Sequence, residues 1–286
     1  MLGECSPYAI QSPMTTHTAQ VRPAAVAGLF YPGSRDALAS TVEALLTAAT
    51  REEPSVPPKA VIAPHAGYIY SGAIAASVYA TLRPARERIT RVVLLGPTHR
   101  VAVRGLALPD AGGFATPLGT IEIDAEAVVG IRHLPQVTVS AAAHALEHSL
   151  EVHLPFLQKA LAHFRLVPLA VGQASPEDVA QVLDILWGGP ETLLVISSDL
   201  SHYLPYRDAQ AMDRRTCDSI LELSTSITHH QACGATPVTG LTLAAKRHGL
   251  RPMLLDLRNS GDTAGDKQRV VGYASFAFCE DAGHAH

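Results

Sequence analysis

Three short apolar runs in this 286-residue chain each lead into side chains that can bind a metal or transfer a proton. The runs and the residues that follow them are 59–63 with His65, 91–95 with His99, and 192–197 with Asp199 and His202. In open α/β sheets, ligands collect beyond the carboxyl ends of the strands. A single histidine after a strand is more often structural than a ligand, but three such strand ends make coincidence a weaker explanation. We therefore expect a metal or acid–base site there.

A fourth reactive side chain, Cys233, comes just before Gly234 and the apolar helical pattern of residues 238–247. Backbone N–H groups and the dipole at a helix N-terminus favour a thiolate, which is both a nucleophile and a metal ligand. The motif also fits a small buried thiol ahead of a helix. Taken alone, it favours that simpler interpretation.

The histidine-rich segment 144–153 offers a competing site. If this stretch is helical, His144 and His148 share one face as two zinc ligands four residues apart would, and Glu151 follows three residues later. The order differs from the HExxH arrangement, because Glu147 immediately precedes the second histidine. The segment could line a pocket or form the polar flank of a helix, and the sequence favours neither.

The elements that must position these residues alternate between strands and helices. The predicted strands are 60–63, 91–95, 166–171, 192–197, 252–257 and 270–278, with a β-excursion over 105–124. A helix is predicted from Ser34 to about residue 50. Another begins at Ser175, where an N-cap is followed by Pro176 and two acids. This alternation predicts one α/β domain with a central, mostly parallel or mixed sheet flanked by helices.

Composition excludes several classes of protein. The chain is 47% hydrophobic and 17% charged, unlike a disordered chain, and its net charge of −4 argues against a nucleic-acid-binding surface. No apolar window is long enough for a membrane span, and the first twenty residues do not resemble a secretory signal. The four cysteines are scattered, which is typical of reduced thiols in a cytoplasmic protein.

The familiar motifs of nucleotide and hydrolase chemistry are absent from the sequence. It contains no GxxxxGK[ST] phosphate loop, no GxGxxG after the first strand, no G-x-S-x-G nucleophile elbow and no paired CxxC motifs. Nucleotide-dependent and α/β-hydrolase functions therefore lose most of their support.

Six ordered motifs resemble those of the Memo family, which in bacteria and archaea is called AmmeMemoRadiSam system protein B. They are Gly28-Leu29-Phe30-Tyr31-Pro32, residues 63–72, residues 96–99, residues 147–156, residues 197–202 and Cys233-Gly234. The resemblance covers about Arg22 to Phe278. It implies a Memo-like α/β domain over residues 21–279, between a flexible N-terminal tail (1–20) and a C-terminal tail (280–286).

The resemblance implies a fold similar to that of class III extradiol dioxygenases, which are non-haem iron enzymes. It also implies a metal bound by His65, His99 and Cys233, with Asp199 and His202 beside it as catalytic residues. His202 resembles the acid–base histidine of the dioxygenases. Iron is the expected metal. Copper and zinc are the alternatives, because a thiolate in place of the dioxygenases' glutamate softens the site.

Three functions follow from these observations. The first is a metal-dependent redox enzyme, with a radical-SAM protein and a companion protein of the same system as partners. The second is a non-catalytic binding or scaffold protein that keeps the pocket, because eukaryotic relatives are linked to cell motility and phosphotyrosine peptides. The third is a metallohydrolase that uses His144, His148 and Glu151. It ranks last because it explains none of the residues at the strand ends.

Overall fold

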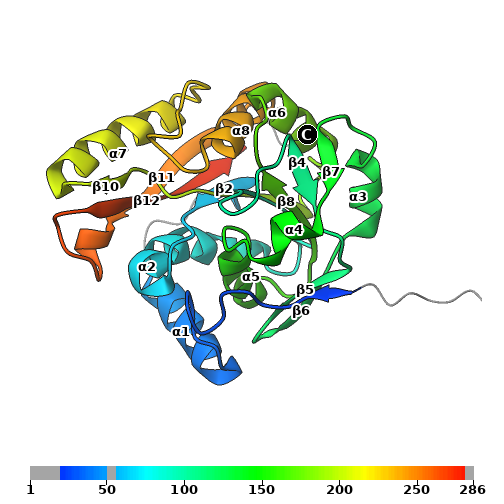
Figure 1. The fold of residues 1–286 in the computed structure, drawn as a ribbon, viewed down its shortest axis with the longest axis horizontal. Helices are drawn as coiled ribbons and strands as arrows, with labels where there is room; N and C mark the ends of the chain where they lie inside the picture. The colour runs from blue at the N-terminus through cyan, green and yellow to red at the C-terminus, as the bar shows by residue number, and fades with distance from the viewer. Residues whose placement is uncertain (1–19, 50–55, 281–286) are drawn as a thin grey trace, which may run out of the picture.

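A nine-stranded sheet forms the centre of the computed structural model, which describes residues 20–49 and 56–280 (Figure 1). Its strands are β2 (Ala60–Ala63), β3 (Arg91–Pro97), β4 (Leu106–Leu108), β7 (Val137–Val139), β8 (Arg165–Val171), β9 (Thr192–Ser197), β10 (His202–Leu204), β11 (Arg251–Asn259) and β12 (Val270–Cys279). The order is β10-β12-β2-β9-β3-β8-β4-β7, and β11 pairs with the other side of β12.

The sheet is mixed, as the sequence predicts. Strands β2, β9, β3 and β8 are parallel to their neighbours at the centre. On one side β12 runs antiparallel to both β2 and β11, and on the other side β4 runs antiparallel to β8. All six predicted strands are present, so the described residues form one mixed α/β domain. The tails predicted at 1–20 and 280–286 lie, apart from Gln20 and Glu280, outside the described residues.

Helices cover both faces of this sheet (Figure 1). They are α1 (Arg35–Ala48), α2 (Tyr68–Tyr79), α3 (Ala125–Ile131), α4 (Ala141–Ala145), α5 (Leu154–Ala160), α6 (Pro176–Ile185), α7 (Tyr206–Leu221) and α8 (Ala235–Arg247), with 3-10 helices η1 (Ala80–Ala85), η2 (Glu151–His153) and η3 (Ser260–Asp262). Side chains of α1, α2 and α5 pack on one face, and those of α3, α6, α7 and α8 pack on the other.

The side chains of β2 alternate between the two hydrophobic cores, which lie on opposite faces of the sheet. Val61 and Ala63 belong to the core on the α1 side, whereas Ala60 and Ile62 belong to the core on the α8 side. Successive side chains of a strand point to opposite faces, so a strand covered on both faces is an unbroken apolar run. This is why the short runs in the sequence are reliable markers of the central strands.

The predicted β-excursion divides between two sheets. Its first part is β4, which joins the main sheet. Its second part forms the hairpin of β5 (Gly113–Thr116) and β6 (Gly119–Glu122), which pairs with β1 (Val21–Arg22) in a separate three-stranded sheet. The hairpin therefore holds the start of the described chain against the domain.

A buried carboxylate fixes this first segment to the rest of the fold. Glu151 is fully buried and accepts hydrogen bonds from Arg22 Nη1 (2.6 Å), from the Ala25 and Val26 N–H groups (2.8 and 2.9 Å), and from Tyr31 Oη (2.6 Å). Because charged hydrogen bonds are about twice as strong as neutral ones, and because this carboxylate has four donors, the segment is firmly held.

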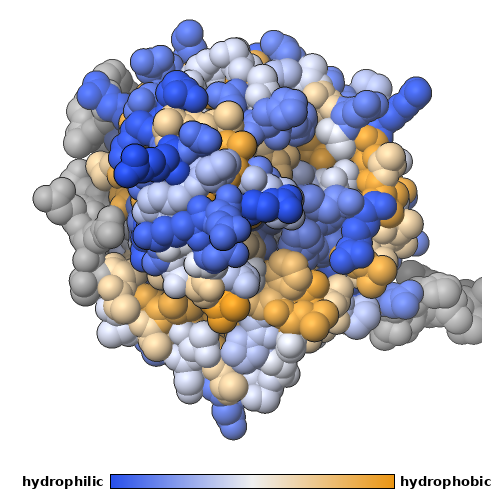
Figure 2. Space-filling model, turned by 60° about the vertical axis from the view of Figure 1, so that its left-hand side comes forward, coloured by the Kyte–Doolittle hydropathy of each residue, from blue (hydrophilic) through white to orange (hydrophobic). Residues whose placement is uncertain are grey.

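The outer surface is mostly polar on the face that Figure 2 shows, with hydrophobic side chains gathered in separate patches. The exposed large hydrophobic residues include Leu29 (81% exposed) and Ile69 (70%). None of the helices among the described residues combines the length and apolar character that crossing a bilayer requires.

We expect the Glu151→Ala variant to lose about 3–5 kcal/mol of unfolding free energy, because it leaves the Arg22 guanidinium buried without its counter-ion. Urea denaturation measures this loss. The control is Glu43→Ala, which breaks an exposed pair with Lys159 (3.3 Å) and should cost no more than about 1 kcal/mol. Equal losses in the two variants would contradict the structural role of Glu151.

Candidate metal centre

The three predicted strand ends meet at one edge of the sheet. Strand β9 lies between β2 and β3, and the three strands run in the same direction. His65, Asp199 and His99 follow the carboxyl ends of β2, β9 and β3 respectively. The prediction that these residues come from neighbouring strand ends is therefore confirmed.

His65 is buried, and its ring orientation is fixed by a serine. Its Nδ1 lies 2.6 Å from Ser197 Oγ, and that hydroxyl donates its own hydrogen to the Ser149 carbonyl (2.6 Å). Ser197 can therefore only accept from the ring, which places the proton on Nδ1 and leaves the Nε2 lone pair free. Burial, together with the nearby His99 and His148, holds the pKa of His65 well below its usual range, so the ring is neutral.

His99 is oriented by a carboxylate. Glu147 Oε1 lies 2.8 Å from His99 Nδ1, and Oε2 accepts the His99 backbone N–H at 2.6 Å. Burial alone would raise the pKa of Glu147, but the hydrogen bonds from His99 and Ser149 lower it to about 2. The ionised carboxylate keeps the proton on Nδ1 and leaves Nε2 of His99 free, an arrangement typical of metal-binding histidines.

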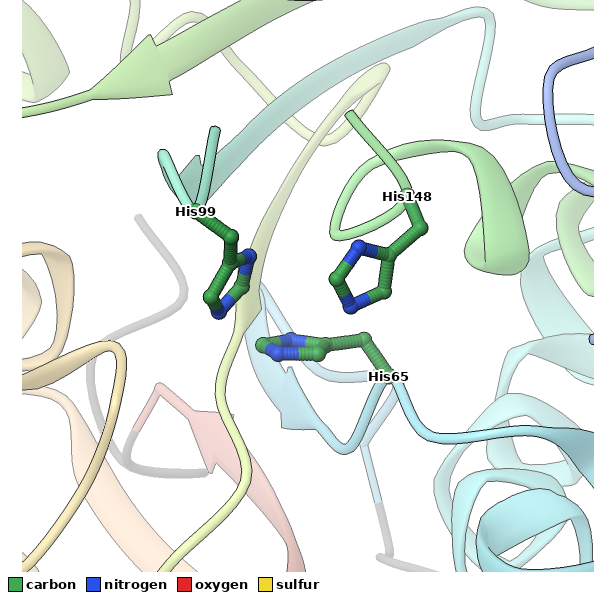
Figure 3. Close-up of side chains that lie close together, drawn as sticks. All are labelled: His65, His99 and His148. Atoms are coloured by element: carbon green, nitrogen blue, oxygen red, sulfur yellow. The ribbon is translucent and has the colours of Figure 1, made fainter. Parts of the chain in front are cut away.

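A third imidazole, His148, completes the cluster (Figure 3). One ring nitrogen from each of His65, His99 and His148 lies within 4.8 Å of the other two. The His99 and His148 rings stack with centroids 4.7 Å apart, and His65 approaches His148 edge-on at 5.4 Å. His148 Nδ1 is buried and makes no hydrogen bond, but it lies 3.3 Å from Glu147 Oε1. The cluster thus brings together three ring nitrogens that could bind a metal ion.

The competing site in segment 144–153 is not assembled. Helix α4 ends at Ala145, so His144 and His148 do not share a helical face. His144 Nε2 lies 2.7 Å from the Ala107 carbonyl instead, and Glu151 is engaged by Arg22 and its other donors. The chain turns after α4 because Arg22 contacts the His144 and Glu147 carbonyls (2.6 and 2.8 Å). A helical spacing argument cannot detect this turn.

Cys233 lies at the same centre. Its Sγ is 3.4 Å from His65 Nε2 and 3.3 Å from the Asp199 backbone nitrogen, which donates to it. Gly234 permits this approach, since a Cβ there would lie 2.6 Å from the Ser197 carbonyl oxygen. Burial, followed by the charge of Asp199, raises the pKa of the Cys233 thiol. The thiol is therefore neutral without a cation beside it, in contrast to the lowered pKa expected at a helix N-terminus.

Asp199 and His202 border the same centre from the loop after β9. Asp199 is buried, and its Oδ1 accepts the His65 backbone N–H at 2.7 Å while Oδ2 lies 4.0 Å from His65 Nε2. His202 is exposed and has its Nδ1 2.9 Å from the Leu200 carbonyl. This contact makes Nδ1 the donor and leaves Nε2 of His202 without a hydrogen bond among the described residues.

The structure identifies three residues of the site to which the sequence assigned no such role. Ser197 and Glu147 hold the rings of His65 and His99, and His148 is the third histidine of the cluster. Glu147 and His148 belong to a motif that the sequence analysis singled out. Their placement depends on Gly96, where a Cβ would lie 2.8 Å from Ser149 Oγ, so that only glycine lets the 147–150 turn approach β3. This glycine beside an expected strand end was the available signal.

A second buried carboxylate supports the loop that carries Asp199 and His202. Asp213 Oδ1, from α7, accepts the Ser201 backbone N–H at 3.0 Å. Gly272 of β12 makes room for it, since a Cβ at that position would lie 2.0 Å from Asp213 Oδ2. Burial raises the pKa of Asp213 to about 6.

The raised pKa of Asp213 predicts a pH-dependent stability. The unfolded chain ionises this group near pH 3.8 and the folded chain near pH 6, so the unfolded state binds fewer protons between these values. The contribution to stability is therefore fully present below about pH 4 and is lost as the pH rises through about 6. Asp213→Asn keeps an acceptor for Ser201 without the charge.

We expect Asp213→Asn to gain up to about 3 kcal/mol relative to the wild type between pH 4 and pH 7, as measured by urea denaturation at each pH. The control is Asp218→Asn, at an exposed position on the same helix, which should show no such trend. A constant difference between Asp213→Asn and the wild type at all pH values would contradict the assignment.

Comparison with known proteins agrees with the sequence motifs. The family described as Memo-like protein matches residues 22–277. A MEMO1 family protein of Aquifex aeolicus is 36% identical over 271 residues, covering 91% of this chain and 99% of that protein. One from Aeropyrum pernix is 36% identical over 288 residues, covering 89% and 98%.

A crystal structure of an uncharacterized protein from Escherichia coli K12 aligns with a TM-score of 0.49 and 13% identity, covering 76% of this chain and 98% of that one. The family match and the relatives at about 36% identity cover most of the chain. The resemblance read from the six motifs is thereby confirmed, and the chain belongs to the Memo-like protein family.

Proposed function

We propose that this protein is a metal-dependent redox protein whose ion is held by His65, His99 and Cys233. The observation that carries the proposal is the grouping of ring nitrogens of His65, His99 and His148 within 4.8 Å of one another, with the Cys233 sulfur outside this group but beside His65. Ser197 and Glu147 bind Nδ1 of the two histidines, so Nε2 is the nitrogen that each offers to an ion, and the Cys233 sulfur lies 3.4 Å from His65 Nε2. His148 lies beside them as a further nitrogen donor.

The donor set fits a transition metal better than a hard cation. Magnesium and calcium prefer oxygen ligands, whereas imidazole and thiolate suit iron, copper and zinc. The buried Cys233 thiol, whose pKa is raised, is the group that a cation here would compensate. We assign iron first, as the fold relationship proposed below implies, with copper or zinc as the alternatives that a thiolate favours.

Bound iron or copper would supply Lewis acidity and one-electron redox chemistry, whereas zinc would supply Lewis acidity alone. The residues of the chain orient the donors and handle protons. Ser197 and Glu147 orient the two imidazoles, and Asp199 holds the backbone of His65 in place. His202 has a free Nε2 at the exposed side of the centre and is the group that holds or releases a proton for a bound molecule.

The mixed sheet with helices on both faces supports a further proposal, that the fold is of the class III extradiol dioxygenase type. In those enzymes a glutamate occupies the third position, for which this chain offers Cys233. Family membership supports the proposal that the protein works in the cytoplasm with a radical-SAM protein and a companion protein of the same system. Co-purification of the three proteins from cells that express them together tests this association.

We expect His65→Gln, His99→Gln and Cys233→Ser to lower iron binding sharply, because a neutral hydroxyl or amide replaces imidazole or thiolate poorly. Iron content is measured by elemental analysis after anaerobic purification and reconstitution. The controls are His163→Gln, an exposed histidine, and Cys279→Ser, at the far end of β12, which should keep the wild-type content. Absence of iron and copper from the reconstituted wild type would contradict the proposal.

The same assay separates Cys233 from His148 as the third donor. Under the proposal, His148→Gln lowers iron affinity less than Cys233→Ser does. Full iron content in Cys233→Ser together with its loss in His148→Gln would reassign the site to three histidines. Glu147→Gln should reduce affinity by roughly 10- to 100-fold, because it removes the carboxylate that orients His99.

We expect His202→Ala to retain the wild-type iron content but to lose roughly 10²- to 10⁴-fold in any turnover that needs proton transfer. Turnover is measured as oxygen consumption with candidate phenolic substrates, and iron content is measured on the same sample. If His202→Ala loses iron, the residue is a ligand and its acid–base assignment is wrong.

A further inference from the structure

A cavity of about 890 Å³ opens directly beside the histidine cluster. Its walls come from the residues after β3, from the connection between β8 and α6, and from the segment before α8. His99 and Cys233 both lie on its lining, so the cavity reaches two of the proposed metal donors. Its volume lies within the usual range for small-molecule sites, about 300–1,000 Å³. Another cavity, of about 810 Å³, lies at the amino ends of the strands, near Arg91 and Arg165.

Arg104 is held on a rigid part of the cavity wall. The backbone on either side of it is bonded to Gln173, because the Gly105 N–H donates to the Gln173 carbonyl (2.7 Å) and the Gln173 N–H donates to the Val103 carbonyl (2.8 Å). The two segments approach so closely that a Cβ at Gly172 would lie 2.0 Å from the Val103 carbonyl oxygen. The guanidinium group therefore projects from a fixed backbone.

Arg104 is an exposed residue at the wall of the cavity, and its charge is unpaired within the described part of the chain. No side-chain hydrogen bond or ion pair there involves its guanidinium group, although it lines the cavity. The cavity also contains one acid, Asp178. That carboxylate accepts the Ser175 N–H (2.9 Å) in the first turn of α6, where the helix dipole offsets its charge. Arg104 is thus the charge in this cavity that still lacks a partner.

The other lining residues favour a ligand that also has a hydrocarbon part. Val103, Val171 and Ala174 contribute apolar surface to the lining of this cavity. The His229 ring is already engaged, since its Nδ1 lies 3.3 Å from the Cys233 carbonyl and its Nε2 lies 3.2 Å from Thr236 Oγ1. An arginine at one wall and apolar side chains beside it match a carboxylate attached to a hydrocarbon group, because guanidinium binds carboxylate through two parallel hydrogen bonds.

We propose that this cavity selects a small organic carboxylate, whose charged group binds Arg104 and whose other end lies at His99 and Cys233. The inference rests on the proposed function, because it makes the cavity the substrate chamber of that metal centre. Selection of an anion, however, depends on residues of the chain alone, so it can be measured in metal-free protein.

The first test uses Cys233 as a reporter of charge in the cavity. The full-length, metal-free protein reacts with two methanethiosulfonate reagents of similar size, the anionic sulfonatoethyl and the cationic trimethylammonioethyl compound. Peptide mass spectrometry follows the rate at Cys233. The intrinsic reactivity of the thiol affects both rates, so the anionic-to-cationic ratio reports the local potential. We expect Arg104→Gln to lower this ratio about three- to tenfold, and high salt to reduce the effect.

Two matched variants complete this test. Arg132→Gln removes an exposed arginine at the end of α3 and should leave the ratio unchanged. Arg104→Lys keeps the charge and should also keep the ratio, which excludes a general disturbance of the wall as the cause. An Arg104→Gln ratio equal to that of the wild type, in a protein with an unchanged melting temperature, would overturn the proposal.

The second test uses a ligand pair of matched shape. Hexanoate should protect Cys233 from the neutral reagent methyl methanethiosulfonate, hexanamide should protect it at least about fivefold less well, and Arg104→Gln should abolish the difference. Equal protection by hexanoate and hexanamide in the wild type would contradict carboxylate selection. Iron content measured in parallel separates the two proposals: a protein that binds no iron but still prefers hexanoate refutes the metal centre alone, whereas iron binding without the preference refutes the carboxylate site alone.

Discussion

The parallel pairing of β2, β9 and β3 is the constraint on which the candidate site depends. Parallel strands all end at the same edge, and three adjacent ones bring the residues that follow them within a few ångströms of each other. His65, Asp199 and His99 come from segments far apart in the sequence, and no local structure could bring them together. The apolar side chains on both faces of these strands hold the register and thereby hold the site.

A second set of interactions sets the chemical state of the donors. Burial and mutual proximity keep the pKa of His65 and of His148 low, so both rings are neutral. Ser197 and Glu147 then orient the rings of His65 and His99 through Nδ1 of each. These partners hold the ring positions with charged or buried hydrogen bonds. The side chains of the candidate site are therefore held in place by contacts within the protein itself.

Much of the fold could be predicted from the sequence, because buried central strands are short apolar runs bounded by glycine and proline. The strands Ala60–Ala63 and Thr192–Ser197 begin and end at the predicted residues. The helix start at Ser175 is confirmed by a capping box with Asp178. The sequence left open whether His144 and His148 share a helical face, and they do not, because the buried Arg22 holds the chain in a turn after Ala145.

The site was predictable to the extent that strand ends determine it. His65, His99 and Asp199 could be placed together from the alternation of elements alone. The approach of Cys233 depended on Gly234 and on a long-range contact with the Asp199 loop, which no periodicity encodes. The family resemblance supplied that residue. The role of Glu147 could not be deduced either, because its partner His99 lies 48 residues away in sequence.

The most direct measurement is X-ray diffraction at the iron absorption edge from crystals of the iron-loaded protein. The account predicts one strong anomalous peak at the edge formed by β2, β9 and β3, roughly 2.0–2.3 Å from a ring nitrogen of His65, a ring nitrogen of His99 and the Cys233 sulfur. A peak that these histidines share with His148 while the Cys233 sulfur lies out of reach, or a peak only at surface histidines, would contradict it.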